Sequence, residues 1–286
     1  MINIKIKNEF SDLKIALIHN AENVISLDDN EWAKIVPKSI LAKHPETGLI
    51  NKDEFVKQQK TYIEFLIQSD VQLISPLTQS NAFCQVYTRD PCFVIDETLF
   101  IGKMKDKYRY PEIEGLKKIK NEIANIIEID GNDVVIEGGD IFVFEDLILV
   151  GTGQITNQAG FDKLKSFIFR QYEVVQIPHF ALHLDCCIAP LPNGMLLYSK
   201  KHLPKASIEL LTRYFIVHLL DENEADNFLS ANLLWINEKK VVSHSFSRKT
   251  NRFLRSCDFI IHEIDFTQPI SMCGSVRCVT CPLLRE

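Results

Sequence analysis

The chain has 286 residues, of which 46 % are hydrophobic and 24 % are charged, as in an ordinary globular protein. Its formal net charge of −6 gives no electrostatic reason to bind nucleic acid or an anionic membrane surface. No apolar run approaches the roughly 18 residues of a membrane-spanning helix, and residues 1–7 alternate apolar and polar side chains instead of forming a signal-peptide core. The eight cysteines fit a reducing compartment. We therefore expect a cytoplasmic protein whose acidic groups suit a small cationic partner.

The first predicted elements are a strand and a capped helix. Residues 13–19 form a short apolar run, which is typical of a buried strand. Residues 20–48 show little periodicity and contain two prolines, so they form either a functional lid or a plain surface loop. A helix begins at Asn51, with Glu54 in capping-box spacing, and a strand follows at residues 71–75. The inner face of this helix carries Phe55, Tyr62, Phe65 and Leu66.

A pair of short apolar strands joined by a turn then occurs four times. Hairpin starts recur about every 45 to 50 residues, which is the scale of structural repeats. The third hairpin turns at Pro192-Asn193-Gly194, a strong turn signal. The four hairpins lie at residues 92–102, at 141–151, on both sides of 192–194, and at 232–243.

Helices are predicted after the first two hairpins. One begins at about Pro111, and apolar residues recur in it at three- and four-residue spacing. The other is capped by Thr156 and is followed by a strand at residues 173–177. The inward faces are predicted to carry Leu116, Ile119, Ile123 and Ile126 in the first helix, and Phe161, Leu164, Phe167 and Ile168 in the second.

The C-terminal residues 272–286 are unusual for a chain end. They contain three cysteines (Cys273, Cys278 and Cys281) and the apolar pair Leu283-Leu284, whereas chain ends are usually polar and frayed. We expect this tail to pair with the strand at residues 13–19, which would add a fifth unit and close a ring. No linker rich in Pro, Gly or Ser divides the chain, so a single domain over residues 1–286 is predicted.

Residues that could take part in catalysis or ligand binding recur at equivalent edges of these hairpins. In a ring of repeats, equivalent positions face a common axis, so these side chains should meet in one pocket. Each has an ordinary structural explanation: Asp90 before a proline is typical of a turn, Gly138-Gly139 of a tight turn, and a histidine between apolar residues of the core. The residues are Asp90, Glu137, Asp140, His183, Asp185 and Cys278.

Four motifs in this set carry a resemblance to a known superfamily. They are Thr88-Arg89-Asp90-Pro91, Glu137-Gly138-Gly139-Asp140, His183-Leu184-Asp185 and the segment from Arg277-Cys278 to the C-terminus. In order and spacing they resemble the guanidino-group-modifying superfamily, which includes arginine deiminases, dimethylarginine dimethylaminohydrolases and amidinotransferases. The resemblance spans nearly the whole chain. It implies an α/β fold, the pentein, which is a five-bladed pseudo-symmetric propeller of ββαβ units.

The resemblance also implies roles for these residues in the hydrolysis of a small substrate that carries a guanidino group. Cys278 would attack the guanidinium carbon and form a covalent amidino-thioether. His183 would protonate the departing amine and then activate water. Charge-assisted hydrogen bonds from Asp90, Glu137 and Asp185 would hold the planar cation, and Glu137 would also orient His183. Asp140 belongs to the same predicted site, where it would support the glycine turn. No metal or cofactor is implied.

The ionisation of the nucleophile is a further expectation. The carboxylates around Cys278 oppose a second negative charge, so the thiolate should form mainly when a bound cation and a protonated His183 offset them.

Three positions bear on the substrate. Ile155 stands where the family carries an arginine that grips the α-carboxylate of the substrate, and an isoleucine cannot do so. Arg109 matches a second family arginine and is either a carboxylate-binding residue or a plain surface arginine. Asp185 pairs well with a free NH2 group but poorly with methyl groups, which favours an unmethylated guanidine.

Several alternatives remain open. An amidinotransferase would use an amine in place of water as the second attacking group. A zinc protein would bind metal through His183 with Cys186-Cys187, or through Cys278, Cys281 and Cys273. A non-catalytic guanidino-binding module and a homodimer are also compatible with the sequence. Cys273 and Cys281 beside the nucleophile would suit a regulatory disulfide.

Overall fold

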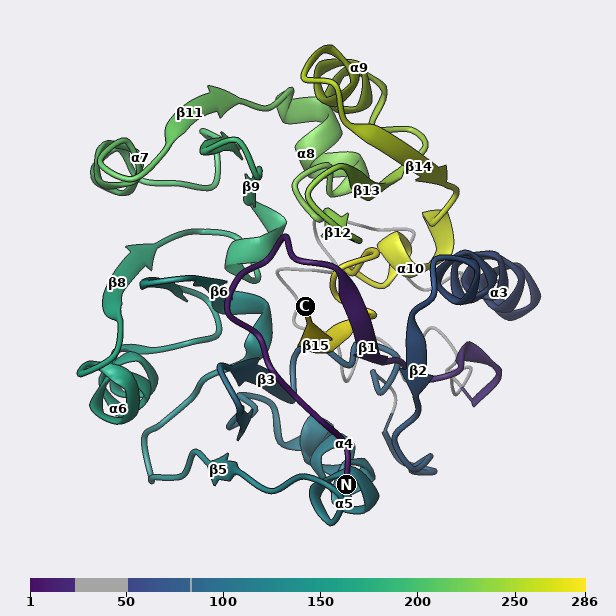
Figure 1. The fold of residues 1–286 in the computed structure, drawn as a ribbon, viewed down its shortest axis with the longest axis vertical. Coiled ribbons are helices and arrows are strands. Elements are labelled where there is room, and N and C mark those ends of the chain that lie inside the picture. Colours follow the sequence, from purple (N-terminus) through teal and green to yellow (C-terminus); the bar gives the residue numbers. More distant parts are fainter. Residues whose placement is uncertain (24–50, 83) are drawn as a thin grey trace.

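The computed structural model describes residues 1–23, 51–82 and 84–286, and the segment 20–48, expected to be either a lid or a plain surface loop, lies almost entirely outside them. In this part of the chain, five three-stranded sheets stand around a central axis (Figure 1). Each sheet joins an antiparallel strand pair to a third strand that runs parallel to the middle one. Four units have the order ββαβ along the chain, whereas in the fifth the inner strand comes last. The predicted α/β fold of five pseudo-symmetric units is confirmed.

Each sheet runs from an inner strand near the axis, through a middle strand, to an outer strand. The four predicted hairpins are all present. In the order inner, middle and outer, the sheets are β3 (Cys92–Ile95), β4 (Thr98–Ile101) and β5 (Ile126–Glu128); β6 (Ile141–Phe144), β7 (Leu147–Thr152) and β8 (Glu173–Pro178); β9 (Ile188–Pro190), β10 (Met195–Tyr198) and β11 (Ile216–Leu219); β12 (Leu234–Trp235), β13 (Lys240–His244) and β14 (Ile260–Ile264); and β15 (Cys281–Arg285), β1 (Leu13–Leu17) and β2 (Gln72–Ile74).

Helices lie outside the ring and connect the middle strand of each sheet to its outer strand (Figure 1). These helices are α3 (Lys52–Gln68), α4 (Tyr110–Gly115) with α5 (Lys117–Lys120), α6 (Gln158–Ile168), α7 (Lys205–Leu211) and α9 (Arg248–Ser256). Two further helices connect neighbouring units, α8 (Glu222–Phe228) and α10 (Thr267–Ser271). Short 3-10 turns are η1 (Ala21–Asn23), η2 (Lys107–Arg109), η3 (Gly138–Asp140) and η4 (Leu184–Cys186).

The two ends of the chain build the fifth sheet together, as predicted. Strand β1 pairs antiparallel with β15, with Leu13 opposite Arg285 and Leu17 opposite Cys281, and parallel with β2. Leu283 is completely buried, which explains why this chain end is apolar. The cap of α3 is also as predicted, because the Asn51 side chain accepts a hydrogen bond from the Glu54 amide.

Three details differ from the sequence predictions. The helix expected from Pro111 is split into α4 and α5, and Ile126 lies in β5, where pairing with Leu99 of β4 outweighs its helical spacing. The cap of α6 is Asn157 and not Thr156, since the Asn157 Oδ1 atom accepts from the Gly160 amide. Phe167 is 42 % exposed, because the buried stripe of α6 passes beside it, and Lys163 packs over its ring.

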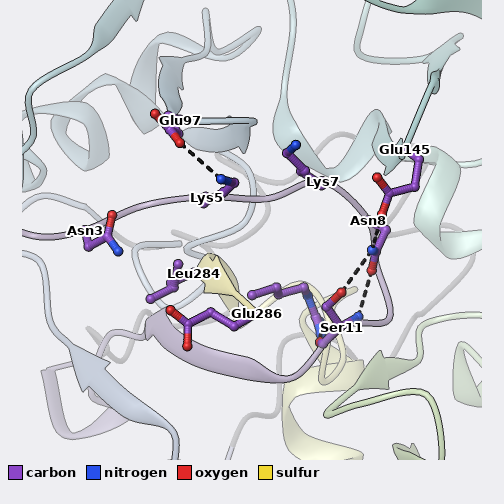
Figure 2. A pocket seen from close by; sticks show the side chains of 10 residues that line it. Asn3, Lys5, Lys7, Asn8, Ser11, Glu97, Glu145, Leu284 and Glu286 are labelled. Atoms are coloured by element: carbon purple, nitrogen blue, oxygen red, sulfur yellow. Dashed lines mark hydrogen bonds and ion pairs between the residues drawn. The ribbon is translucent and has the colours of Figure 1, made fainter.

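The inner strands all begin at one end of the axis, which we call the start end, and the hairpin turns lie at the other, the turn end. At the turn end, the N-terminal segment crosses the ring beside the turns and β15 (Figures 1 and 2). Backbone bonds hold it there, from Lys5 to Leu283 and in both directions between Ile6 and Asp96. Within the ranges that the structure describes, no helix has the length and apolarity needed to span a bilayer.

Candidate active site

The five segments that precede the inner strands meet at the start end and are hydrogen-bonded in a closed ring. The Arg89 amide donates to the Cys278 carbonyl at 3.1 Å, which joins the first unit to the fifth. The Gly138 amide donates to the Asp90 carbonyl at 2.9 Å, which joins the second unit to the first. Close approach here requires glycine, because a Cβ atom on Gly138 would lie 2.1 Å from the Arg89 carbonyl oxygen.

Side chains complete the remaining links of this ring. The Leu184 amide donates to Asp140 Oδ1 at 2.7 Å, which joins the third unit to the second. The Asn232 side chain connects the third, fourth and fifth units, because Nδ2 donates to the Asp185 carbonyl at 3.2 Å and Oδ1 accepts from the Arg277 amide at 2.9 Å. Each unit therefore fixes the position of its neighbours' functional segment.

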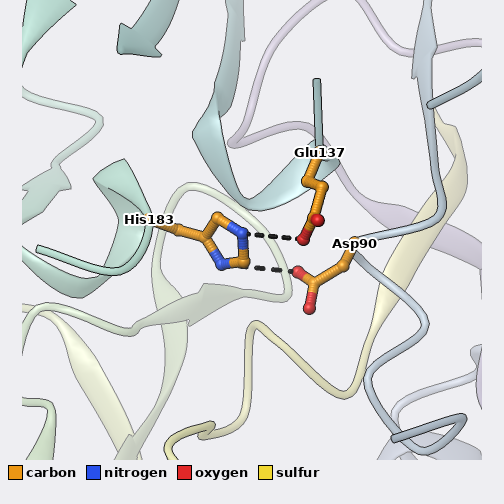
Figure 3. Close-up of side chains that lie close together, drawn as sticks. All are labelled: Asp90, Glu137 and His183. Carbon is orange, nitrogen blue, oxygen red and sulfur yellow. Dashed lines mark hydrogen bonds and ion pairs between the residues drawn. The ribbon is translucent and has the colours of Figure 1, made fainter. Parts of the chain in front are cut away.

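His183 lies between two carboxylates at the centre of this end (Figure 3). Its Nε2 is 3.0 Å from Glu137 Oε2, and its Nδ1 is 3.7 Å from Asp90 Oδ1. Burial opposes a charged imidazole, but the charge of Asp90 and the hydrogen bond to Glu137 outweigh it and raise the pKa of His183 well above its ordinary value. These contacts favour the imidazolium form of the ring.

Arg109 contributes a second cation to the same cluster. Its Nη1 lies 3.0 Å from Asp90 Oδ2 and 3.4 Å from Glu137 Oε2. Its Nε and Nη2 form two 2.8 Å bonds with the two oxygens of Glu112. Burial would lower the pKa of Arg109, but these three carboxylates raise it well above the ordinary value. A guanidinium of the protein itself thus occupies one side of the predicted guanidinium site.

The carboxylates around these cations respond differently to burial. Burial would raise the pKa of Glu137, but the hydrogen bond from His183 and the charge of Arg109 outweigh it and lower this pKa. Burial raises the pKa of Glu112 to about 7 in spite of Arg109. Asp90 Oδ1 is buried and has no hydrogen-bond partner among the described residues, which leaves one acceptor at the centre of the cluster.

Cys278 lies beside the acid of the third unit and is buried. Its Sγ is 3.1 Å from Asn232 Nδ2 and 3.9 Å from Asp185 Oδ2. A hydrogen bond to Cys278, and then burial, raise the pKa of Cys186 well above its usual range, so this second thiol stays protonated next to the first. Burial raises the pKa of Asp185 to about 6, although the charges of Arg277 and His183 oppose this rise.

Asp140 lies behind the site and not in it. It is completely buried, and Oδ1 accepts from the Leu184 amide and pairs with His179 Nε2 at 3.0 Å. Its Oδ2 accepts from the Thr156 amide at 3.4 Å. Both oxygens are therefore engaged by the protein, and Asp140 fixes the backbone next to His183.

Some residues of the site are absent from the sequence predictions. Asn232 occupies in the fourth unit the place that Asp90, Glu137 and Cys278 occupy in theirs, so the repeat pattern was a signal that could have found it. Glu112 stands three residues after Arg109, a spacing that favours an ion pair on a helix. His179 carried no recognisable signal.

The structure also places the cysteines of the alternative hypotheses. The Sγ atoms of Cys281 and Cys92 are 3.9 Å apart, so the thiol of Cys281 lies against a thiol of the first unit. In the described part of the chain, one group has ligand atoms close enough for a metal ion, and it consists of Asp90, Glu137 and His183 without a cysteine. Within the described residues, the cysteines of the zinc hypothesis therefore do not belong to a group of this kind.

Comparisons with known proteins identify the family of the chain. The family model for arginine deiminase matches residues 4–213. The uncharacterized protein YkgA of Bacillus subtilis (strain 168) is 29 % identical over 246 residues, covering 85 % of this chain and 85 % of that one. The arginine deiminase of Listeria monocytogenes serotype 4b (strain CLIP80459) is 25 % identical, covering 83 % and 69 %.

Among solved structures, the amidinotransferase SxtG of Microseira wollei, from the saxitoxin biosynthetic pathway, superposes with a TM-score of 0.83 at 15 % identity, over 99 % of this chain and 97 % of that chain. This likeness extends the shared fold to the whole ring. The chain belongs to the arginine deiminase family, and through it to the guanidino-group-modifying proteins of the pentein fold.

Proposed function

We propose that the protein is a hydrolase that breaks a C–N bond of a guanidino compound through a covalent intermediate on Cys278. The observation that supports this most is the hydrogen-bonded ring, which holds a thiol, an imidazolium and several carboxylates at one buried end of the axis. A guanidinium carbon is a poor electrophile because the group is resonance-stabilised, so its reaction needs a thiolate and fixed geometry. Membership of the arginine deiminase family supports the same reaction class.

In the first step, the Cys278 thiolate forms an S–C bond with the guanidinium carbon. His183, held as an imidazolium by Asp90 and Glu137, gives its proton to the nitrogen that departs. The C–N bond breaks, its electron pair goes to that nitrogen, and ammonia or an amine leaves. An amidino-thioether on Cys278 and a neutral His183 remain.

In the second step, water replaces the sulfur. Neutral His183 accepts a proton from water as the oxygen forms a bond with the amidino carbon. The C–S bond then breaks, its electron pair returns to Cys278 as thiolate, and the second proton of the attacking water passes to solvent as the neutral ureido product forms. The carbon has exchanged one nitrogen for one oxygen, and His183 is again an imidazolium.

The substrate cation is held by two carboxylate oxygens next to His183 and Cys278, of which Asp185 Oδ2 also lies 3.5 Å from Arg277 Nε. The unpartnered Asp90 Oδ1 faces His183, and Asp185 Oδ2 lies 3.9 Å from the Cys278 sulfur. A guanidinium bonded to both would place its carbon near the sulfur. Asp185 favours a free NH2 group there, so we propose an unmethylated guanidine as substrate.

Arg109 has two roles open to it in this site. As the charge partner of Asp90 and Glu137, it keeps its place in the cluster. As a ligand of a substrate carboxylate, it would have to give up its two 2.8 Å bonds with Glu112, while Ile155, which is buried, offers no second cation. Replacing Arg109 by lysine distinguishes them: a rise in KM confined to carboxylated substrates would indicate the second role, and a loss for every substrate the first.

The test is release of ammonia or amine from a panel of arginine, methylarginines, agmatine and guanidino acids. We expect turnover of at least one unmethylated member and, with Cys278→Ala, a loss of at least about 10³-fold with binding retained. Cys257→Ala, which changes a half-buried thiol on another unit, is the matched control and should keep turnover. A chelator should not change the rate, since no step uses a metal.

Three results would contradict the proposal. Turnover retained by Cys278→Ala would remove the nucleophile. Transfer of the amidino group to an added amine, faster than hydrolysis, would indicate an amidinotransferase. A folded protein that binds guanidines but converts none would indicate a binding module.

A further inference from the structure

Asn232 has a contact with the nucleophilic sulfur that none of the proposed catalytic roles uses. The residue lies two positions before the fourth inner strand, and it is 1 % exposed. Its Nδ2 lies 3.1 Å from Cys278 Sγ, closer than the 3.9 Å between that sulfur and the Asp185 carboxylate. The sulfur is therefore nearer to this amide than to the acid beside it.

The orientation of this amide is determined by its surroundings. The Oδ1 atom accepts from the Arg277 amide at 2.9 Å and from the Cys278 amide at 3.3 Å. The Nδ2 atom donates to the Asp185 carbonyl at 3.2 Å. If the side-chain oxygen and nitrogen were exchanged, N–H groups would face two N–H donors and an oxygen would face a carbonyl. The atom next to the sulfur must therefore be the nitrogen, and its second N–H points to Cys278.

We infer that Asn232 stabilises the Cys278 thiolate by donating this N–H to the sulfur, and so makes the thiol reactive inside a cluster of acids. This inference rests on the proposed function only in that Cys278 is the nucleophile. A hydrogen bond to an ionised acceptor is about twice as strong as one between neutral groups, so the amide favours the thiolate over the thiol. The amide counteracts Asp185, whose negative charge disfavours a second one.

The same contact serves both halves of the reaction. The thiolate is the attacking group when the S–C bond forms, and it is the leaving group when that bond breaks. An amide fixed by three backbone bonds requires no reorganisation at either moment. Asn232 keeps its proton in this hydrogen bond and transfers none, so it does not compete with His183 as the general acid.

The test is the rate at which iodoacetamide alkylates Cys278, followed against pH with peptide mass spectrometry to isolate that residue's modification. The first variant is Asn232→Asp, which can still accept from the Arg277 and Cys278 amides but cannot donate to the sulfur. The matched control is Asn157→Asp. Asn157 has the same pattern of bonds, accepting from the Val135 and Gly160 amides and donating to the Asp133 carbonyl, without a sulfur contact.

We expect Asn232→Asp to lower the alkylation rate of Cys278 at pH 7 by about ten-fold or more, the effect of one hydrogen bond to a charged group. The midpoint of its pH profile should move to higher pH, and turnover should fall with it. Asn157→Asp should keep the wild-type profile. Asn232→Asp also places a negative charge beside the sulfur, so Asn232→Ser, whose shorter side chain withdraws the donor without adding a charge, is measured beside it with the same expectation and stands alone if Asn232→Asp does not fold.

The inference is overturned if the Asn232 variants show the wild-type profile, or a change no larger than that of Asn157→Asp. Alkylation requires no substrate, so this result is independent of turnover. Should Cys278→Ala retain activity, the proposed function fails while the alkylation profiles still report on the amide contact.

Discussion

The two ends of the ring axis carry similar charged groups but use them differently. At the turn end, Lys5 pairs with Glu97 at 3.2 Å, with side chains 40 % and 59 % exposed. At the start end, Arg109 pairs with Asp90 at 3.0 Å, with side chains 9 % and 6 % exposed. The turn end also has a polar pocket beneath the N-terminal segment, where Asn8 bonds to Glu145 and Ser11 (Figure 2).

This difference teaches where a repeated fold can support chemistry. Water screens an exposed pair, so such pairs contribute about 0–1 kcal/mol and tolerate change. A buried charge is costly unless it is paired. The charged side chains of the start end can therefore stay buried only because each unit supplies a partner to the next. That interdependence shifts the pKa values of the buried groups and fixes the orientation of their side chains. Catalysis needs both, and the exposed pairs of the turn end provide neither.

The largest effect, on stability, is expected from removing β15, the strand that pairs the C-terminal end of the chain with its N-terminal end and closes the ring. Deleting residues 281–286 removes β15 with its buried Cys281, Leu283 and Leu284. Each buried leucine contributes about 2 kcal/mol, and β1 would lose one of its two partners, against a total stability of about 5–15 kcal/mol. We expect no cooperative unfolding transition by circular dichroism. Deleting Glu286 alone should leave the transition in place, and an unaffected longer deletion would show that the ring does not need closing.

The next comparison exchanges one carboxylate at each end. Glu137→Gln removes the hydrogen-bonded charge that helps raise the pKa of His183, so fewer imidazoles are protonated at neutral pH and the leaving group lacks its acid. Turnover should fall by about 10²–10⁴-fold, as for loss of general acid catalysis. Glu145→Gln at the turn end should keep the wild-type rate. Equal rates for both variants would remove the functional distinction between the ends.

A smaller effect is expected in the pH dependence of stability. Burial raises the pKa of Asp185 to about 6 in the folded protein, against about 3.9 for an unfolded aspartate. The folded state therefore binds this proton more tightly, and the free energy of unfolding should fall as pH rises from about 4 to about 6, by up to about 3 kcal/mol. Asp185→Asn should lack this part of the fall in urea unfolding. Glu97→Gln at the turn end should keep it, and identical slopes for all three proteins would contradict the burial of a costly charge.

The smallest effect should come from the exposed pair at the turn end. Lys5→Ala removes the partner of Glu97 and should lower the free energy of unfolding by less than about 1 kcal/mol. The difference should shrink further in about 1 M salt, where the screening length is only about 3 Å. A loss of several kcal/mol that persists in salt would show that this end is as interdependent as the other.

The fold was largely predictable because each repeat can be recognised from a short, continuous stretch of sequence. Short apolar runs on both sides of a turn mark each hairpin, and an apolar chain end marks the closing strand. The helices after the third and fourth hairpins were not predicted; α9 has the polar sequence Arg248–Ser256 and buries few apolar residues. Ile126 was assigned to a helix because its spacing fits one, and only pairing with β4 decides otherwise.

The site was predictable at the residues that resemble family motifs and much less so elsewhere. Titratable residues attract attention, whereas Asn232 is neutral and its importance depends on a contact with Cys278 from another unit. The orientation of the Arg109 side chain could not be predicted either, since a guanidinium is equally suited to the protein surface, to a substrate carboxylate or to a buried acidic side chain. Only the packed ring shows that it faces Asp90 and Glu137.

The pairing of β1 with β15 has a consequence for the order in which the protein can form. During synthesis β15 follows every other strand of the five sheets, so β1 waits for its inner neighbour until almost all of the ring has emerged. Contacts between such distant segments are slow to form because a long loop must close first. The proposed nucleophile Cys278 lies three residues before this strand, so a reactive thiol should be assembled only in chains whose ring is already complete.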